Sequence, residues 1–216
     1  MAGAGETTEI KEPGGKLRLY VEAELFQGAT ISLSEAQAHY LLHVMRAKTG
    51  QRVTLFNGRD GEWLAEIAAA DKRGVSLILL RKTQKQAGVP DLWLLFAPIK
   101  KTPADYLTQK ATELGVAVLQ PVITRHTVVH RINLERMAAN AVEAAEQSGR
   151  FTVPEIREAL PLEKALADWP RERRLYFCDE DGEARPLAKM ALPGAAAILI
   201  GPEGGFHMEE RAYLRR

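Results

Sequence analysis

Two patterns of apolar residues meet near residue 90, and this change limits the possible folds more than any other feature of the sequence. Before it, the apolar residues form short strand-like runs at residues 17–21, 53–56, 63–67 and 75–80. The pairs Asn57-Gly58 and Asp60-Gly61 are typical of hairpin turns between such strands. After it, strands and helices alternate, which predicts an α/β domain with a parallel sheet.

One helix interrupts the first pattern. Ser34 and Gln37 have the spacing of a capping box, and Leu41, Leu42 and Met45 follow at helical spacing. We therefore predict a small β-barrel with one embedded helix over residues 17–86, preceded by a disordered tail over residues 1–16.

The second pattern begins after a polar linker, residues 83–90. Residues 91–97 are a nearly continuous apolar run, as expected for a strand that is covered on both faces. Thr102 as N-cap and Pro103 as first helical residue predict a helix that ends at Leu114, before Gly115. The remaining predicted strands are 116–122, 174–178 and 195–200, and the remaining predicted helices are 133–147, 162–167 and 208–216. Residues 91–216 thus form the α/β domain.

Composition argues against a membrane protein and against a secreted protein. There is no apolar run of about 18 residues and no secretory signal, and the lone Cys178 indicates a buried structural thiol. We expect a cytoplasmic protein without a membrane segment.

The charge is unevenly distributed along the chain. Residues 17–90 hold ten lysines and arginines against seven acidic residues, whereas the net charge of the whole chain is only +1. This asymmetry is compatible with RNA docking on the first domain, although on charge alone scattered solvated lysines and arginines are the favoured explanation.

The segment Gly201-Pro202-Glu203-Gly204-Gly205 is the strongest local signal for a ligand site. A buried strand brings it to the carboxyl edge of the sheet, where open α/β folds bind their ligands. Gly204 and Gly205 allow positive φ, and their backbone can approach a ligand without a Cβ in the way. The alternative is a tight strand-to-helix connection without a ligand. The segment matches neither the dinucleotide-binding nor the phosphate-loop pattern.

Two polar clusters precede this turn. Asp105, Gln109 and Glu113 share a helix face with Lys110 beside them. Asn140, Glu143 and Gln147 share a face of the next long helix, and Arg150 follows its end. Either cluster could instead be a solvated surface or a helix interface. His39 and His43 lie four residues apart without a third metal ligand, so no metal site is predicted.

Taken in order, these segments resemble the RsmE-type family, which methylates N3 of a uracil in small-subunit (16S) ribosomal RNA. The matching segments are His39-x-x-x-His43-Val44-Met45-Arg46, Lys100-Lys101, residues 109–116, residues 144–150 and residues 200–206. The resemblance implies a PUA-like barrel followed by a SPOUT methyltransferase domain with a C-terminal trefoil knot. It also implies S-adenosylmethionine as cofactor, 16S rRNA or the small ribosomal subunit as partner, and a homodimer.

The same resemblance assigns roles to individual residues. Those expected to bind the cofactor are Ile200, Gly201, Pro202, Glu203, Gly204 and Gly205. Those expected to contact RNA are Arg18, His43, Arg46, Lys100, Lys101, Lys110, Arg125, Gln147 and Arg150. Glu113, Arg150 and Glu203 are the expected catalytic residues, since N3 of uracil must lose a proton, but the general base stays unassigned.

The family continues past residue 216 with another cofactor loop and a final helix. We therefore expect a C-terminally truncated domain with an incomplete knot and doubtful activity. Two alternatives stay open. One is a non-catalytic RNA-binding protein with a defective methyltransferase domain, and the other is a SPOUT methyltransferase that modifies another RNA base.

Overall fold

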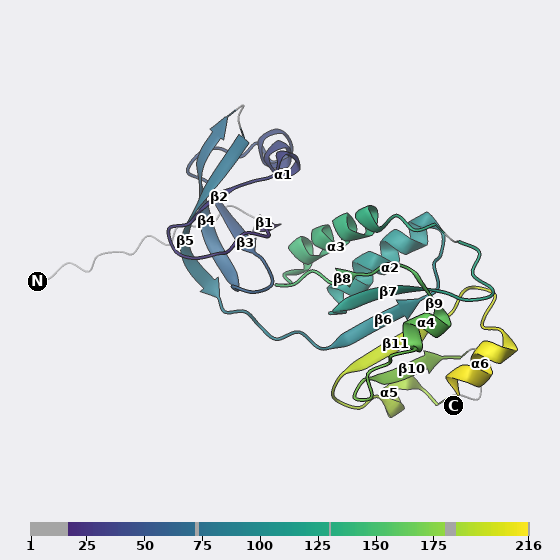
Figure 1. The fold of residues 1–216 in the computed structure, drawn as a ribbon. Coiled ribbons are helices and arrows are strands. Elements are labelled where there is room, and N and C mark those ends of the chain that lie inside the picture. The colour runs from purple at the N-terminus through teal and green to yellow at the C-terminus, as the bar shows by residue number, and fades with distance from the viewer. Residues whose placement is uncertain (1–16, 72–73, 130, 180–184, 216) are drawn as a thin grey trace, which may run out of the picture. The chain divides into compact units, whose positions relative to one another are not determined.

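The structure, a computed structural model, describes residues 17–71, 74–129, 131–179 and 185–215. Two compact units divide the chain, residues 1–85 and 86–216, and each is described by itself (Figure 1). The predicted tail over residues 1–16 lies outside the described residues, as do Lys72 and Arg73.

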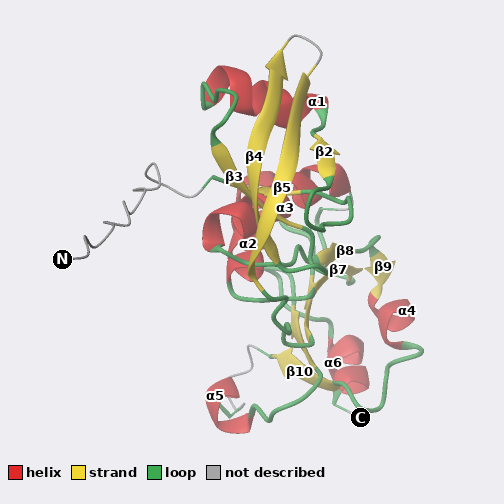
Figure 2. Ribbon diagram, turned by 90° about the vertical axis from the view of Figure 1, so that its left-hand side faces the viewer, coloured by secondary structure: helices red, strands yellow, loops and turns green. Residues whose placement is uncertain are grey.

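The first unit is a five-stranded sheet in the order β1-β3-β4-β5-β2. Its strands are β1 (Arg18–Tyr20), β2 (Thr30–Ser32), β3 (Arg52–Phe56), β4 (Glu62–Asp71) and β5 (Gly74–Gln84). Figure 2 shows β4 and β5 as the two longest arrows, and register shifts along this antiparallel pair let the sheet bend around its core. All four predicted strands are present. The three-residue β2 was missed because it is too short to show an alternating pattern, and β5 extends two residues into the predicted linker.

The predicted capping box is confirmed. Ser34 caps α1 (Glu35–His39), its hydroxyl accepts a hydrogen bond from the Gln37 backbone, and Gln37 bonds back to the Ser34 amide. The helix then widens into a π-helical turn, η1 (Tyr40–Val44). Leu41 is fully buried in the core of the unit, whereas Met45 is 45% exposed and does not belong to that core.

The second unit is a parallel sheet, which confirms the predicted α/β architecture. The main strand order is β10-β11-β6-β7-β8, and β9 pairs with β7. The strands are β6 (Leu92–Phe96), β7 (Val118–Ile123), β8 (Glu155–Ile156), β9 (Leu160–Pro161), β10 (Arg174–Cys178) and β11 (Ala196–Ile200). The helices are α2 (Lys101–Glu113), α3 (Leu134–Ser148), α4 (Leu162–Leu166), α5 (Leu187–Met190) and α6 (Met208–Leu214).

Helices cover both faces of this sheet. Leu94 and Phe96 of β6 pack in a cluster with residues of α2 and α3. Leu95, between them, packs in a second cluster with α4, Phe206 and α6. Side chains alternate between the two faces of a strand, so the apolar run of β6 is explained by burial on both sides, as predicted.

Two local predictions in this unit are wrong. Helix α2 begins at Lys101 with Lys100 as its N-cap, so Thr102 is not the cap and Pro103 is the third helical residue. Proline is tolerated there because amides of the first turn have no partner within the helix. Cys178 is exposed at the end of β10 rather than buried, although desolvation still raises the pKa of its thiol.

The ends of the long helices follow the sequence more closely. Asn133 caps α3, and Gly149 ends it in the left-handed conformation. No described helix has both the length and the apolarity needed to cross a bilayer. Helix α6 is the last helix or strand of the described residues. No observation tests the C-terminal knot, which stays a prediction.

Candidate functional site

The centre of the parallel sheet contains a topological switch point. Strands β6 and β11 are neighbours, and the helices that follow them lie on opposite faces of the sheet. Helix α2 packs in the hydrophobic cluster that contains Leu94 and Phe96, and α6 packs in the cluster that contains Leu95. In open α/β sheets such a point leaves a crevice outside the carboxyl ends of the two strands. The segments at this crevice are residues 97–100 after β6 and residues 201–207 after β11.

The turn at residues 201–205 has a defined shape. A Cβ on Gly201 would overlap the ring of Phe206, which is 4% exposed and packs edge-on against Phe177 with ring centroids 4.8 Å apart. Gly205 adopts φ 69° and its amide donates to the Pro202 carbonyl at 2.9 Å. The expectation of positive φ therefore holds at Gly205 only. At Gly204 a Cβ would make an ordinary 3.5 Å contact with His126.

The loop after β7 holds this turn in place. The Nδ1 atom of His126 lies 3.1 Å from the Gly204 carbonyl oxygen and 3.2 Å from that of Gly205. Since both partners are acceptors, this nitrogen must carry a proton. The buried carboxylate of Glu210 accepts from the amides of Arg125 and His207, both at 2.9 Å. The turn and the start of α6 are thus fixed to the β7 loop.

Arg125, expected to contact RNA, lies in this loop. Its guanidinium forms an ion pair with Glu209 and lies 3.0 Å from Nδ1 of His207. His126, His207 and Glu210 were not predicted as site residues. Only the spacing of His207 and Glu210, which form a capping box at the start of α6, was a signal in the sequence.

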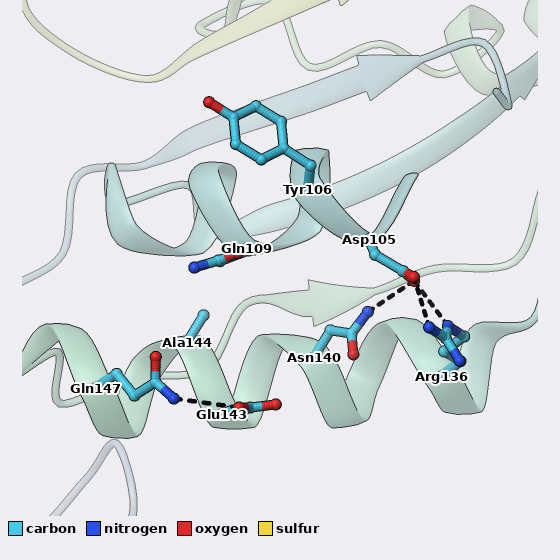
Figure 3. Close-up of a pocket in the computed structure, with 8 residues that line it drawn as sticks. All are labelled: Asp105, Tyr106, Gln109, Arg136, Asn140, Glu143, Ala144 and Gln147. Carbon is cyan, nitrogen blue, oxygen red and sulfur yellow. Dashed lines mark hydrogen bonds and ion pairs between the residues drawn. The ribbon is translucent and has the colours of Figure 1, made fainter. Parts of the chain in front are cut away.

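A polar groove lies between α2 and α3, with a cavity of about 290 Å³. Figure 3 shows Asp105, Tyr106 and Gln109 of α2 and, from α3, Arg136, Asn140, Glu143, Ala144 and Gln147. Hydrogen bonds from Arg136 and then from Asn140 hold the pKa of the Asp105 carboxyl below its ordinary value, against the effect of desolvation. Parts of the two predicted polar clusters therefore line one groove, whereas Lys110, Glu113 and Arg150 are not among its lining residues.

A second cavity of about 320 Å³ opens at the carboxyl end of β6. Its wall includes the apolar residues Phe96, Pro98 and Ile99 and the cation Lys101. Asp105 and Arg136 line both cavities, so their ion pair stands between them. Of the expected RNA contacts, Lys101 lines this cavity, Gln147 lines the polar groove, and Lys100 is the exposed N-cap of α2.

The three expected catalytic residues are not brought together within the chain. Glu203 lies in the turn at the carboxyl edge of the sheet. Glu113 ends α2 at the opposite edge, where a hydrogen bond from Lys110, followed by one from Gln109, holds the pKa of its carboxyl below the ordinary value. Arg150 donates to the carbonyls of Thr112 at 2.5 Å and Val116 at 3.0 Å. It therefore fixes the end of α2.

The expected RNA contacts of the first unit differ in exposure. Arg18 is 8% exposed, pairs with the buried Glu62 at 3.0 Å and covers the Phe56 ring, so its guanidinium is not presented to a ligand. His43 and Arg46 are exposed at the end of η1. Among the described residues other than glycine, Arg46 alone has positive φ, at 52°.

The described residues contain no group of three or more His, Cys, Asp or Glu side chains that could hold a metal ion. The rings of His39 and His43 lie 4.6 Å apart, with no further ligand from the described part of the chain beside them.

Comparison with known proteins identifies both units. Residues 86–216 match the family model of an RNA methyltransferase domain, and residues 33–80 match that of an RNA methyltransferase PUA domain. Ribosomal RNA small subunit methyltransferase E of Rickettsia conorii is 32% identical over 89% of this chain and 80% of its own length. The protein of the same name from Synechocystis is 28% identical over 88% of this chain and 64% of its own length.

Solved structures agree with these matches. A crystal structure of Ribosomal RNA small subunit methyltransferase E from Neisseria gonorrhoeae, bound to S-adenosyl methionine, has a TM-score of 0.81 and 28% identity. A Legionella pneumophila protein solved with bound SAM has a TM-score of 0.80 and 26% identity. Each alignment covers 92% of this chain and 84% of the other.

Proposed function

Because this chain belongs to the RNA methyltransferase family, we propose that it transfers the methyl group of S-adenosylmethionine to N3 of a specific uridine in 16S ribosomal RNA. The observation that carries the proposal is the turn at residues 201–205, which ends a central strand at the switch point of the sheet. The relatives named above act on small-subunit ribosomal RNA, and two structural neighbours bind the same cofactor.

The residues of the turn fit this cofactor. Ile200 is 43% exposed at the end of β11 and offers an apolar contact, and Gly204 presents backbone without a side chain. We assign cofactor binding to residues 200–205, with Pro202 buried beneath the turn. When bound, S-adenosylmethionine supplies an electrophilic methyl group on a sulfonium.

The protein must remove the N3 proton of uracil and hold the base in line with the methyl group. Within the described part of the chain, the exposed carboxylate of Glu203 makes no hydrogen bond or ion pair, whereas Lys110 and Gln109 engage Glu113. We therefore assign proton removal to Glu203 rather than Glu113. Arg150 is assigned as a positioning residue that acts through the end of α2.

RNA recognition is assigned to both units. N3 lies on the pairing edge of uracil, so the target base must be unpaired or flipped out of its stack. The exposed His43 and Arg46 of the first unit and the cations Lys100 and Lys101 of the second present donors to such a strand. Arg18 is left out of this set because it is buried.

The test is methyl transfer to small ribosomal subunits that lack the modification. After incubation with S-adenosylmethionine, the rRNA is digested and its nucleosides are separated by liquid chromatography and identified by mass spectrometry. We expect 3-methyluridine at one position, formed only with cofactor. Methylation of another base, or cofactor binding without any transfer, would contradict the proposal.

Carboxylate variants test the assignment of the base. In single-turnover reactions Glu203→Gln should slow methyl transfer by about a hundredfold or more, as is typical for loss of a general base. Glu113→Gln is the matched control at the opposite edge of the sheet and should stay within a few-fold of wild type. Equal rates for Glu203→Gln and wild type would remove Glu203 from the mechanism.

A further inference from the structure

The amide side chains in the groove between α2 and α3 have fixed orientations, because each donates to a carboxylate. Gln109 Nε2 donates to Glu113 at 2.9 Å. Figure 3 shows the other two bonds, from Asn140 Nδ2 to Asp105 at 2.8 Å and from Gln147 Nε2 to Glu143 at 3.1 Å. An amide nitrogen held by a carboxylate leaves the amide oxygen on the other side. None of these three oxygens accepts a hydrogen bond from any residue that the structure describes.

The carboxylates of the groove differ in their partners. Asp105 pairs with Arg136 through two hydrogen bonds of 2.8 and 2.6 Å, so its charge is balanced. Glu143 accepts only from the neutral Gln147 amide, through Oε1, and its Oε2 has no partner among the described residues. The groove therefore presents an unbalanced carboxylate and three amide oxygens, all of which are acceptors. Such a site fits a ligand with several N–H donors on one edge.

Among the RNA bases, guanine has the edge that matches. Its ring N1–H and its exocyclic amino group are adjacent donors. Adenine and cytosine each place a ring acceptor beside their amino group, and uracil has a single N–H between two carbonyl oxygens. These acceptors would face the oxygens of the groove. Sequence-specific RNA recognition commonly uses such contacts to the pairing edge of unstacked bases.

The position of the groove also fits RNA. Ala144, 2% exposed, is the smallest side chain of the lining and leaves room between the helices. On the other side of the Asp105–Arg136 pair, Lys101 and Arg131 line the second cavity and can bind the phosphate of an adjoining nucleotide.

We propose that the groove between α2 and α3 binds one guanine of single-stranded RNA, with Glu143 accepting hydrogen bonds from its N1–H and amino group. Asn140 and Gln147 supply the neighbouring acceptors. This inference rests on the proposed function, because it gives the methyltransferase a specificity pocket for a guanine apart from the modified uridine.

The experiment measures binding of the full chain to fluorescein-labelled RNA nonamers by fluorescence anisotropy. The strands are all uridine, or carry one central guanine or one central adenine. We expect wild type to bind the guanine strand about tenfold more tightly than the other two, the discrimination of a good bidentate contact. Equal affinity for all three strands would overturn the proposal.

Glu143→Gln keeps the shape of the side chain but removes its charge and one acceptor. The affinities of this variant for the three RNA strands should agree within about twofold. Its affinity for the all-uridine strand should equal that of wild type. The matched control is Glu135→Gln, the same change at an exposed position in the first turn of α3, outside the groove. Retention of the guanine preference in Glu143→Gln, or its loss in Glu135→Gln, would contradict the assignment.

Free guanosine monophosphate separates a nucleotide site from an RNA site. It should displace the guanine strand only at concentrations well above the dissociation constant of that strand. Displacement at equal concentration would overturn the assignment to RNA. The methylation assay and the binding assay test the two proposals separately. A guanine preference without methyl transfer refutes only the proposed function, and methyl transfer without a guanine preference refutes only this inference.

Discussion

Two glycines of the turn have different roles at the level of single residues. A Cβ on Gly201 meets the Phe206 ring, whereas a Cβ on Gly204 makes only an ordinary contact with His126. Gly201→Ala should therefore lower the free energy of unfolding by about 1–3 kcal/mol, the usual cost of overpacking. Gly204→Ala should leave stability unchanged and weaken binding of S-adenosylmethionine, because the ligand approaches that backbone.

Calorimetric titration and thermal melting measure the two effects separately. Gly88→Ala is the control, since a Cβ there meets no atom within 4 Å and its φ is not positive. Tight cofactor binding by Gly204→Ala would contradict the assignment of that residue to the cofactor site.

Two arginines of the first unit, Arg18 and Arg46, are also expected to have different roles. Arg18 and Glu62 form a buried pair with side chains 6% exposed, so Arg18→Ala leaves a buried carboxylate without its partner. We expect a loss of about 3–5 kcal/mol in unfolding free energy. Arg46 is exposed, so Arg46→Ala should preserve stability but reduce the salt dependence of RNA binding by about one phosphate contact.

Denaturant unfolding and RNA binding at several salt concentrations distinguish these cases. An Arg46→Ala variant with the wild-type salt slope would show that Arg46 makes no phosphate contact. An Arg18→Ala variant with wild-type stability would contradict the structural role of the buried pair.

At the level of elements, the loop after β7 and the turn after β11 act as one assembly. His126 joins them through two carbonyl oxygens and Glu210 through two amides. We expect His126→Ala to raise the KM for S-adenosylmethionine by about five- to tenfold, as for the loss of about one net hydrogen bond. Its kcat should change less, because His126 does not touch the reacting atoms.

His126→Asn tests the geometry, since the asparagine amide nitrogen can replace the donor at Nδ1. This variant should recover most of the wild-type KM, whereas His126→Asp, which lacks a donor, should resemble alanine. Failure of asparagine to recover function, with the fold intact, would mean that the imidazole acts in another way.

At the scale of the whole molecule, we propose a homodimer. Met208 at the start of α6 is 80% exposed, and a large apolar side chain at such a position is suited to an interface. Sedimentation velocity should give twice the mass of one chain at micromolar concentration. Met208→Glu should shift the protein towards monomer, and Leu114→Glu, at an apolar residue that is 81% exposed at the opposite edge of the sheet, is the control.

The sequence predicted those helices and strands well whose formation depends on interactions between residues close in the chain. The Ser34 capping box, the helix predicted over residues 133–147 and the apolar run of β6 depend on residues close in the chain. The cap at Thr102 was wrong, because the observed N-cap, Lys100, makes no side-chain cap hydrogen bond and is not a residue that favours this position. Short strands such as β2 carry no periodic pattern.

Pairings between distant residues were outside the reach of such signals. The sequence alone identified the RNA methyltransferase family, the α/β sheet and the turn at residues 201–205 as a candidate site. Only the tertiary structure buried the side chain of Arg18, joined His126 to the turn and brought Asn140 into hydrogen-bond contact with Asp105. These outcomes depend on packing and hydrogen bonds between segments tens of residues apart, which residue type and spacing do not encode.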